Sequence, residues 1–205
     1  MAQFKDHQAD EKHETRELLL NRIPELNKRK PRLLTLPSNN FIFESMVLER
    51  YPNAIIDCME IDVKLYNQTK DKLPIKVNYE FGDIFDKLQD NPDTYDFIWL
   101  DLCGNLSTSN MYNIISAVQT SLKKTCIFAF TLASAREQRT KIFTNMYNCT
   151  GQEFRYKVFP KMIVKLGRMF HPKLALKKLV KYKNTSNSVP MSLYLFQTFF
   201  SKLLY

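Results

Sequence analysis

The stretch that decides the fold is Thr94–Ser107, TYDFIWLDLCGNLS, together with Ile55–Asp62, IIDCMEID, and Tyr79–Asp86, YEFGDIFD. Each is a short apolar or alternating run that ends in a carboxylate at a predicted turn. In an open parallel sheet the carboxyl ends of neighbouring strands meet along one edge, where ligands bind. Strands that end in Glu60, Asp83 and Asp101 would place three acids around one pocket. Such a pocket suits a ligand with ribose hydroxyls, an exocyclic amine and a cationic group.

Strands and helices are predicted to alternate around this stretch. Five strands are expected, at Arg32–Leu36, Ala54–Met59, Ile75–Phe81, Phe97–Leu100 and Thr125–Leu132. The expected helices are Glu11–Leu26, a helix capped by Asn39 or Asn40 that runs through Tyr51, one from Asp62 toward Asp71, Ser109–Leu122 and Ala135–Tyr147. This alternation favours an α/β fold with a parallel sheet and right-handed crossovers.

The end of the chain breaks the alternation. Phe154–Val164 alternates weakly and predicts a sixth strand, Lys173–Lys183 reads as a basic excursion, and Met191–Phe199 predicts a returning seventh strand. We therefore expect one domain with a seven-stranded, mostly parallel sheet whose last strand is antiparallel. Residues 1–30 would form an N-terminal helical extension, and residues 31–205 the domain itself, with a basic C-terminal part at 154–205.

Composition supports a folded intracellular protein. With 205 residues and 44% hydrophobic content, the chain can bury a full core but is short for two domains. The four cysteines are scattered, which argues against a disulfide framework or a zinc site. No apolar run approaches the roughly 20 residues that span a bilayer. The N-terminus lacks the apolar core of a signal peptide, so we expect a cytoplasmic or nuclear location.

Positive charge is concentrated in the last quarter of the chain. The net charge is +9, and 11 of the 30 basic residues follow Glu153, after which there is no acid. Such a segment attracts polyanions, and we expect it to bind nucleic acid. The candidate contacts are Lys173, Lys177, Lys178 and Lys181. A solvated face, a surface for an acidic partner protein and a membrane surface are the alternatives.

The order of these motifs resembles the class I methyltransferases, a Rossmann-like three-layer family that binds S-adenosylmethionine. The resemblance covers roughly residues 30–135 and implies S-adenosylmethionine as cofactor. It implies that Glu60 binds the ribose hydroxyls and that Asp83 accepts from the adenine amine beside an apolar wall at Ile84. It also implies that Asp101 is the catalytic or substrate-orienting group, with Gly104 allowing close approach. The plain structural interpretations are a surface Glu60 and turn-capping roles for Asp83 and Asp101.

The chain departs from the family pattern after the first strand. Where the family has Gly-x-Gly, this sequence has LPSNNF at Leu36–Phe41. Asn tolerates positive φ better than most residues, so Pro37 and Asn39 are expected to form the turn beside the amino acid end of the cofactor. Glu44 follows on the first helical turn and would meet the ammonium group. The LDLCGN segment lacks the Pro-Pro-aromatic and Pro-Cys signatures of two subclasses that methylate DNA amino groups and cytosine carbon.

Two functions follow from these observations. The first is methyl transfer from S-adenosylmethionine to a nucleic acid. The second is a non-catalytic methyltransferase-like module that binds nucleic acid or a partner protein within a larger complex. An intact cofactor site favours the first function, whereas aromatic filling of the space near Pro37–Phe41 favours the second.

Overall fold

The structure is a computed structural model, and it describes residues 10–74, 76–133, 141–184 and 189–199. The elements in these ranges are α1 (Asp10–Leu20), η1 (Ile23–Leu26), β1 (Arg32–Thr35), α2 (Ile42–Arg50), β2 (Ile55–Glu60), α3 (Val63–Thr69), η2 (Lys70–Lys72), β3 (Val77–Phe81), α4 (Ile84–Asp90), β4 (Phe97–Asn105), α5 (Thr108–Thr120), β5 (Ile127–Ala133), α6 (Lys141–Met146), α7 (Gly151–Glu153), the π-helical turn η4 (Phe154–Val158), α8 (Phe159–Gly167), β6 (Ala175–Asn184) and β7 (Val189–Gln197).

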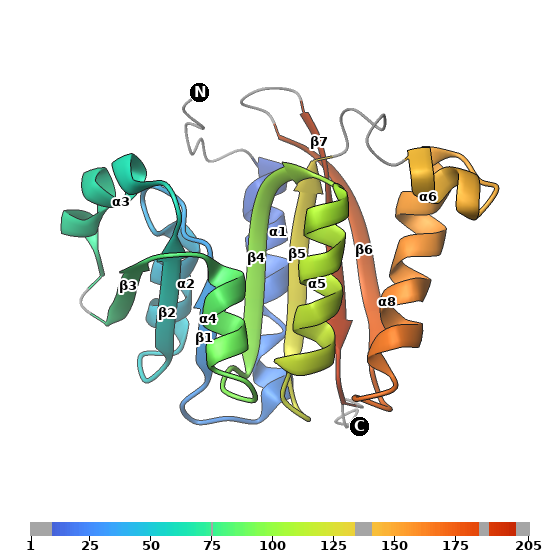
Figure 1. Ribbon diagram of the computed structural model, residues 1–205. Coiled ribbons are helices and arrows are strands. Elements are labelled where there is room, and N and C mark those ends of the chain that lie inside the picture. Colours follow the sequence, from blue (N-terminus) through green and yellow to red (C-terminus); the bar gives the residue numbers. More distant parts are fainter. Residues whose placement is uncertain (1–9, 75, 134–140, 185–188, 200–205) are drawn as a thin grey trace.

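Seven strands form one sheet in the order β3-β2-β1-β4-β5-β7-β6 (Figure 1). The pairs among β1 to β5 are parallel, and β7 is antiparallel to both β5 and β6. The predicted seven-stranded, mostly parallel sheet with an antiparallel last strand is therefore confirmed. The parallel strands run upward in Figure 1, so their carboxyl ends lie on the upper side of the sheet.

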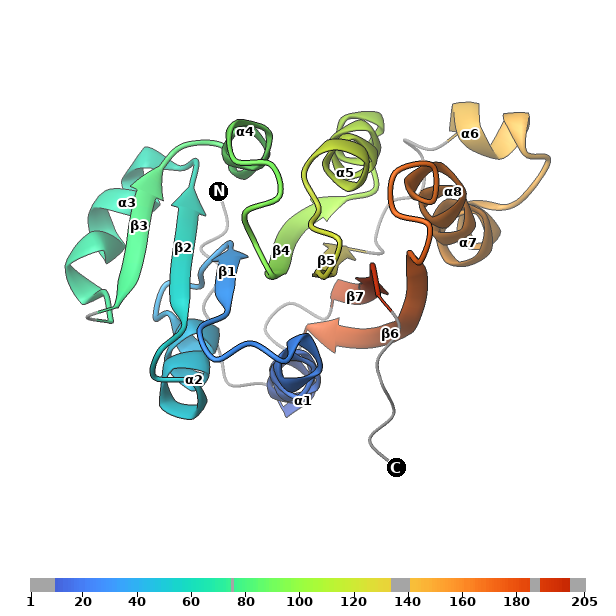
Figure 2. The ribbon, with the colours of Figure 1, turned by 90° about the horizontal axis from the view of Figure 1, so that it is seen from below.

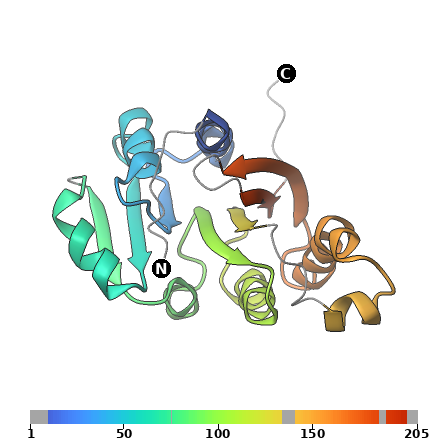
Figure 3. The same ribbon diagram turned by 90° about the horizontal axis from the view of Figure 1, so that it is seen from above.

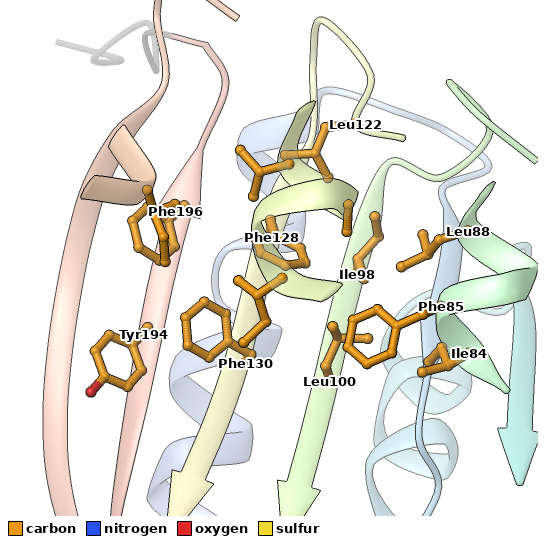
Figure 4. Close-up of a cluster of buried hydrophobic side chains, with 14 of the residues drawn as sticks. Ile84, Phe85, Leu88, Ile98, Leu100, Leu122, Phe128, Phe130, Tyr194 and Phe196 are labelled. Carbon is orange, nitrogen blue, oxygen red and sulfur yellow. The ribbon is translucent and has the colours of Figure 1, made fainter. Parts of the chain in front are cut away.

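Helices cover both faces of the sheet, as the views along the strands show (Figures 2 and 3). One face packs against α4, α5 and α8, and its core includes Phe128, Phe130 and Tyr194 (Figure 4). The other face packs against α1, η1 and α2, and its core includes Trp99 and Leu193. Because β4 and β5 are covered on both sides, their side chains are almost all apolar, as the continuous Phe97–Leu100 run predicts.

Local sequence signals explain several boundaries. The Asp62 carboxylate accepts from the backbone N–H groups of Lys64 and Leu65 at 2.8 and 3.2 Å, which confirms its predicted place at the start of a helix. The predicted N-terminal helix is shorter than expected, because α1 ends at Leu20 and a 3-10 turn follows. The part of the predicted helix Ala135–Tyr147 before Lys141 lies outside the described residues.

The prediction of a sixth strand at Phe154–Val164 is wrong, because this segment is helical through η4 and α8. Its buried residues are Phe154, Arg155, Phe159, Pro160 and Ile163, and Gly167 is buried further along α8. Phe159, Ile163 and Gly167 recur every four residues, which is a helical period, and the five-residue step from Phe154 to Phe159 matches the π-helical turn. That single step breaks the helical pattern and makes the segment resemble a weak strand.

The basic excursion predicted at Lys173–Lys183 is instead β6, an edge strand paired with β7. Lysines are common on edge strands because their charge prevents pairing with other chains. The register shifts between Leu176 and Lys178, so Lys177 is the extra residue of a bulge. Among the described residues, no helix is long and apolar enough to cross a membrane.

Candidate functional site

Three of the predicted site residues lie level with one another on neighbouring segments of the sheet. Glu60 ends β2 and Pro37 follows β1, but Asp101 does not end a strand as predicted, because β4 continues to Asn105. Thr35 of β1 pairs with Cys58 of β2 on one side and with Trp99 of β4 on the other. Two residues further along these three strands are Pro37, Glu60 and Asp101. Neighbouring strands are ~4.8 Å apart, so Glu60 and Asp101 are separated by about 10 Å across the β1 end. We call this region, with the Gly82–Asp83 turn after β3, the strand-end site.

Glu60 is the last residue of β2 and is half-buried. Its Oε1 atom accepts from the backbone N–H of Asp62 at 2.7 Å, which fixes the direction of the carboxylate. Burial raises the pKa of Glu60 above its usual value, although the hydrogen bond from Asp62 opposes that rise. A held carboxylate with a second oxygen for further donors can accept from vicinal hydroxyls.

Asp83 follows β3 and begins α4, where its Oδ1 atom accepts from the N–H of Phe85 at 2.8 Å. Ile84 is buried in the core under α4. Gly82 has a φ of 157°, and its N–H donates to the carbonyl of Glu60 at 3.0 Å. A Cβ atom at Gly82 would approach Met59 Cε to 3.1 Å, so this turn, which ties Asp83 to the end of β2, favours glycine.

The turn after β1 forms without glycine. Pro37 and Asn39 are partly exposed. The prediction that Asn39 or Asn40 caps α2 is wrong, since the residue before the helix is Phe41. Phe41 adopts a left-handed conformation with φ 49°, for which Asn was the expected residue type. Its ring is buried against Tyr79, edge to face with centroids 5.2 Å apart, and Phe43 packs similarly on Trp99 at 4.6 Å. Both rings contact strand residues that precede the strand ends.

Glu44, predicted to meet a ligand ammonium group, is a buried carboxylate in the first turn of α2. The hydroxyl of Thr35 donates to its Oε1 atom at 2.6 Å, and Thr35 Oγ1 also lies 3.2 Å from Cys58 Sγ. Burial and the charge of Glu44 both raise the pKa of the Cys58 thiol, which therefore stays protonated. Thr35 thus links Glu44 to the carboxyl end of β1.

Asp101 contacts two residues that sequence reasoning did not place in the site. The hydroxyl of Thr131, its neighbour on β5, donates to Asp101 Oδ1, and the ammonium of Lys12 lies 3.3 Å from Oδ2. Both side chains of the ion pair are largely buried. Thr131 could have been predicted because it lies close to the end of a predicted strand. Lys12 is on α1, almost 90 positions from Asp101 in sequence, and no local sequence pattern indicates that the two residues meet.

Apolar side chains at the strand-end site are exposed. Ile61, next to Glu60, is 66% exposed, and Phe81, before Gly82, is 54% exposed. Tyr66 packs beside Phe81 with centroids 5.9 Å apart. Large exposed apolar groups at a strand end mark a surface that a flat, apolar ligand can cover. The sequence signal for this surface is Ile61, an apolar residue between the acids Glu60 and Asp62 at a predicted strand end.

Gly104 lies near the end of β4 and is exposed. A Cβ atom there would lie 3.3 Å from Asn110 Nδ2, which donates to the carbonyl of Asn105 at 2.9 Å. Gly104 therefore allows the start of α5 to pack against β4. No cluster of three or more metal-ligating side chains occurs within the described ranges.

The four predicted nucleic-acid contacts do not form one patch. Lys178 and Lys181 both line a cavity beside α1, together with Glu14 and Leu18. Lys181 Nζ lies 3.8 Å from the centre of the Tyr156 ring, toward η4. Lys173 and Lys177 are exposed at the start of β6.

Comparisons with known proteins agree on the fold. No family model and no curated protein sequence matches the chain. Solved structures do match: a geranyl diphosphate methyltransferase in complex with S-adenosylmethionine is 7% identical with TM-score 0.56, over 91% of this chain and 85% of that one. Spermidine synthase from Thermotoga maritima is 11% identical with TM-score 0.58, over 93% and 61%. The tRNA methyltransferase TrmK from B. subtilis is 10% identical with TM-score 0.53, over 89% and 64%.

The chain spans less than two thirds of the synthase and of the tRNA enzyme, and the identities are low, so the likeness concerns architecture. The sheet order and the antiparallel β7 agree with it. The chain has the Rossmann-like fold of the class I S-adenosylmethionine-dependent methyltransferases.

Proposed function

We propose that the protein binds S-adenosylmethionine at the strand-end site and transfers its methyl group to a nucleic acid. The observation that carries this proposal is the level placement of Glu60 and Asp101 on either side of the β1 end, with exposed Ile61 beside them. Several structural neighbours are methyltransferases, and TrmK acts on tRNA. The basic C-terminal part supplies the matching charge for such a substrate.

The residues present fit this cofactor. Glu60, oriented by the Asp62 N–H, would accept from the ribose hydroxyls, and Asp83 would accept from the adenine amine through the oxygen that does not cap α4. Ile61 would cover one face of the adenine ring, in the place that we had expected Ile84 to occupy. Pro37 and Asn39 would lie beside the methionine end, with Glu44 behind them compensating its positive charge.

When bound, S-adenosylmethionine supplies an electrophilic methyl group, so the protein has mainly to align the acceptor and exclude water. Asp101 is the group we assign to that task. Its position is fixed by the Thr131 hydroxyl, and its charge is balanced by Lys12. A carboxylate held in this way can accept a hydrogen bond from an acceptor amine or hydroxyl and take its proton as the bond to carbon forms.

Isothermal titration calorimetry with S-adenosylmethionine tests this proposal. We expect saturable binding that is weakened by Glu60→Ala. Transfer of labelled methyl to RNA or DNA, abolished by Asp101→Ala, would then support catalysis. The absence of any heat of binding at millimolar cofactor would refute the enzymatic function.

The second candidate is a non-catalytic module that binds nucleic acid or a partner protein. One observation favours it: the turn after β1 has no glycine and contains buried Phe41 in a left-handed conformation. A Cβ atom in that turn restricts how closely a ligand can approach the backbone. Nucleic acid binding without cofactor binding would support this candidate.

A further inference from the structure

A cavity of about 530 Å³ lies between α8 and the edge strand β6. It is at the opposite end of the sheet from β3 (Figure 1). Three strand spacings separate β6 from β4, so the cavity is about 14 Å from the strand that carries Asp101. It is therefore distinct from the strand-end site. We call it the basic groove.

Four cations line the basic groove: Lys157, Lys161, Lys165 and Arg168. They follow one stripe of the helix, because the first three recur every four residues, or ~6 Å along the axis. The opposite stripe, with Phe159 and Ile163, is buried against the sheet. The groove cations thus form a row along the outer side of α8. The row exists because this segment is a helix and not the strand that the sequence predicted.

The charge of this row is hardly compensated. Lys157 lies 3.5 Å from Glu153, the last acidic residue of the sequence, and the pair is exposed. Arg168 Nε donates to the carbonyl of Leu174 at 2.9 Å, which neutralises no charge. Within the described part of the chain, Lys161 and Lys165 have no carboxylate partner. A row of like charges without acids costs stability through repulsion and is typical of a surface that meets a polyanion.

The floor of the groove is apolar. Pro160 and Val164 of α8 and Leu176 of β6 line it between the cations and the strand. A duplex offers mainly phosphates to a protein surface, whereas an unpaired strand also offers sugars and base faces that can cover apolar groups. Phe170, which is 55% exposed just after α8, adds an aromatic face near the Arg168 end.

We propose that the basic groove binds a single-stranded segment of the nucleic acid substrate, with Lys157, Lys161 and Lys165 on successive phosphates and the apolar floor against sugars or bases. This inference rests on the proposed function, since it names where the substrate is held. The groove holds one part of the strand beside β6, which leaves the nucleotides beyond it free to extend toward the strand-end site.

Fluorescence anisotropy with a labelled, unstructured oligouridylate tests the proposal. The test variant is Lys161→Glu combined with Lys165→Glu, and the charge-matched control is Lys28→Glu combined with Lys30→Glu, on an exposed loop before β1. We expect the test variant to lose on the order of tenfold in affinity and the control to lose little. The slope of log affinity against log salt should fall by roughly 1.4, because each lost contact with a single strand contributes ~0.7.

Binding of other ligands distinguishes a single-stranded nucleic acid from a duplex or an acidic protein as the occupant of the groove. A matched RNA duplex and inorganic polyphosphate should bind more weakly than the oligouridylate. Equal affinity for the duplex would overturn the single-stranded assignment, and equal affinity for an acidic polypeptide would favour a protein partner instead. If test and control variants lose the same affinity, the groove is not the site.

Cofactor titrations on the same preparations separate this inference from the proposed function. The groove variant should bind S-adenosylmethionine normally, and Glu60→Ala should bind oligouridylate normally. If the unmutated protein binds no cofactor but binds oligouridylate through the groove, methyl transfer fails while the strand-binding site stands. If it binds cofactor but the groove variant keeps its RNA affinity, only the groove assignment fails.

Discussion

Replacement of Glu60 tests the cofactor site most directly. Its carboxylate is half-buried and already oriented by the Asp62 N–H at 2.7 Å. Ligand binding therefore loses no free energy to ordering of this side chain. Hydrogen bonds to a charged group contribute about 1.5–3 kcal/mol. Glu60→Ala should therefore weaken S-adenosylmethionine binding by roughly tenfold to 150-fold.

Glu60→Gln is the matched variant, because its amide oxygen can still accept from Asp62. Neutral hydrogen bonds have about half the strength of charge-assisted ones, so we expect a loss of only ~4- to 12-fold. Calorimetry at constant pH gives both dissociation constants, and thermal melting checks that the variants remain folded. If the protein binds the cofactor and Glu60→Ala leaves the dissociation constant unchanged, the assignment of Glu60 to the ribose is incorrect.

Three further predictions concern pH and stability. Because burial raises the pKa of Glu60 above its usual value, its carboxylate takes up a proton at a higher pH than an ordinary glutamate does. Cofactor affinity should therefore decline as the pH is lowered through that raised pKa, whereas Glu60→Gln should show no such decline in calorimetry. Gly167→Ala would place a Cβ atom against the side chains of Leu174 and Val118, and should lower the free energy of unfolding by ~1–3 kcal/mol in urea titrations. Asp62→Ala removes the cap of α3 and should cost ~1 kcal/mol by the same measurement; an unchanged midpoint would show that the cap contributes nothing.

Much of the fold could be predicted from the sequence because its signals are local. Continuous apolar runs such as Phe97–Leu100 identify central strands, and a carboxylate at a strand end, as at Glu60 and Asp62, marks the turn and the helix that follows. The order of these elements is enough to predict a parallel sheet with helices on both faces. That order is enough to predict Glu60 at the end of β2 and Asp83 in the turn after β3, but not that β4 continues past Asp101 to Asn105.

The tertiary structure decided what depends on distant contacts. Lys12 reaches Asp101 only because α1 packs under the sheet, and no local pattern records that contact. The segment after Glu153 is a helix because Phe159 and Ile163 pack against the sheet and are buried there. Lys173–Lys183 forms an edge strand, where the lysines are in contact with solvent. The sequence determined that positive charge gathers in the last quarter of the chain. Only the packing of α8 beside β6 turned part of that charge into a groove, because burial of one helical stripe aligns the cations of the opposite stripe.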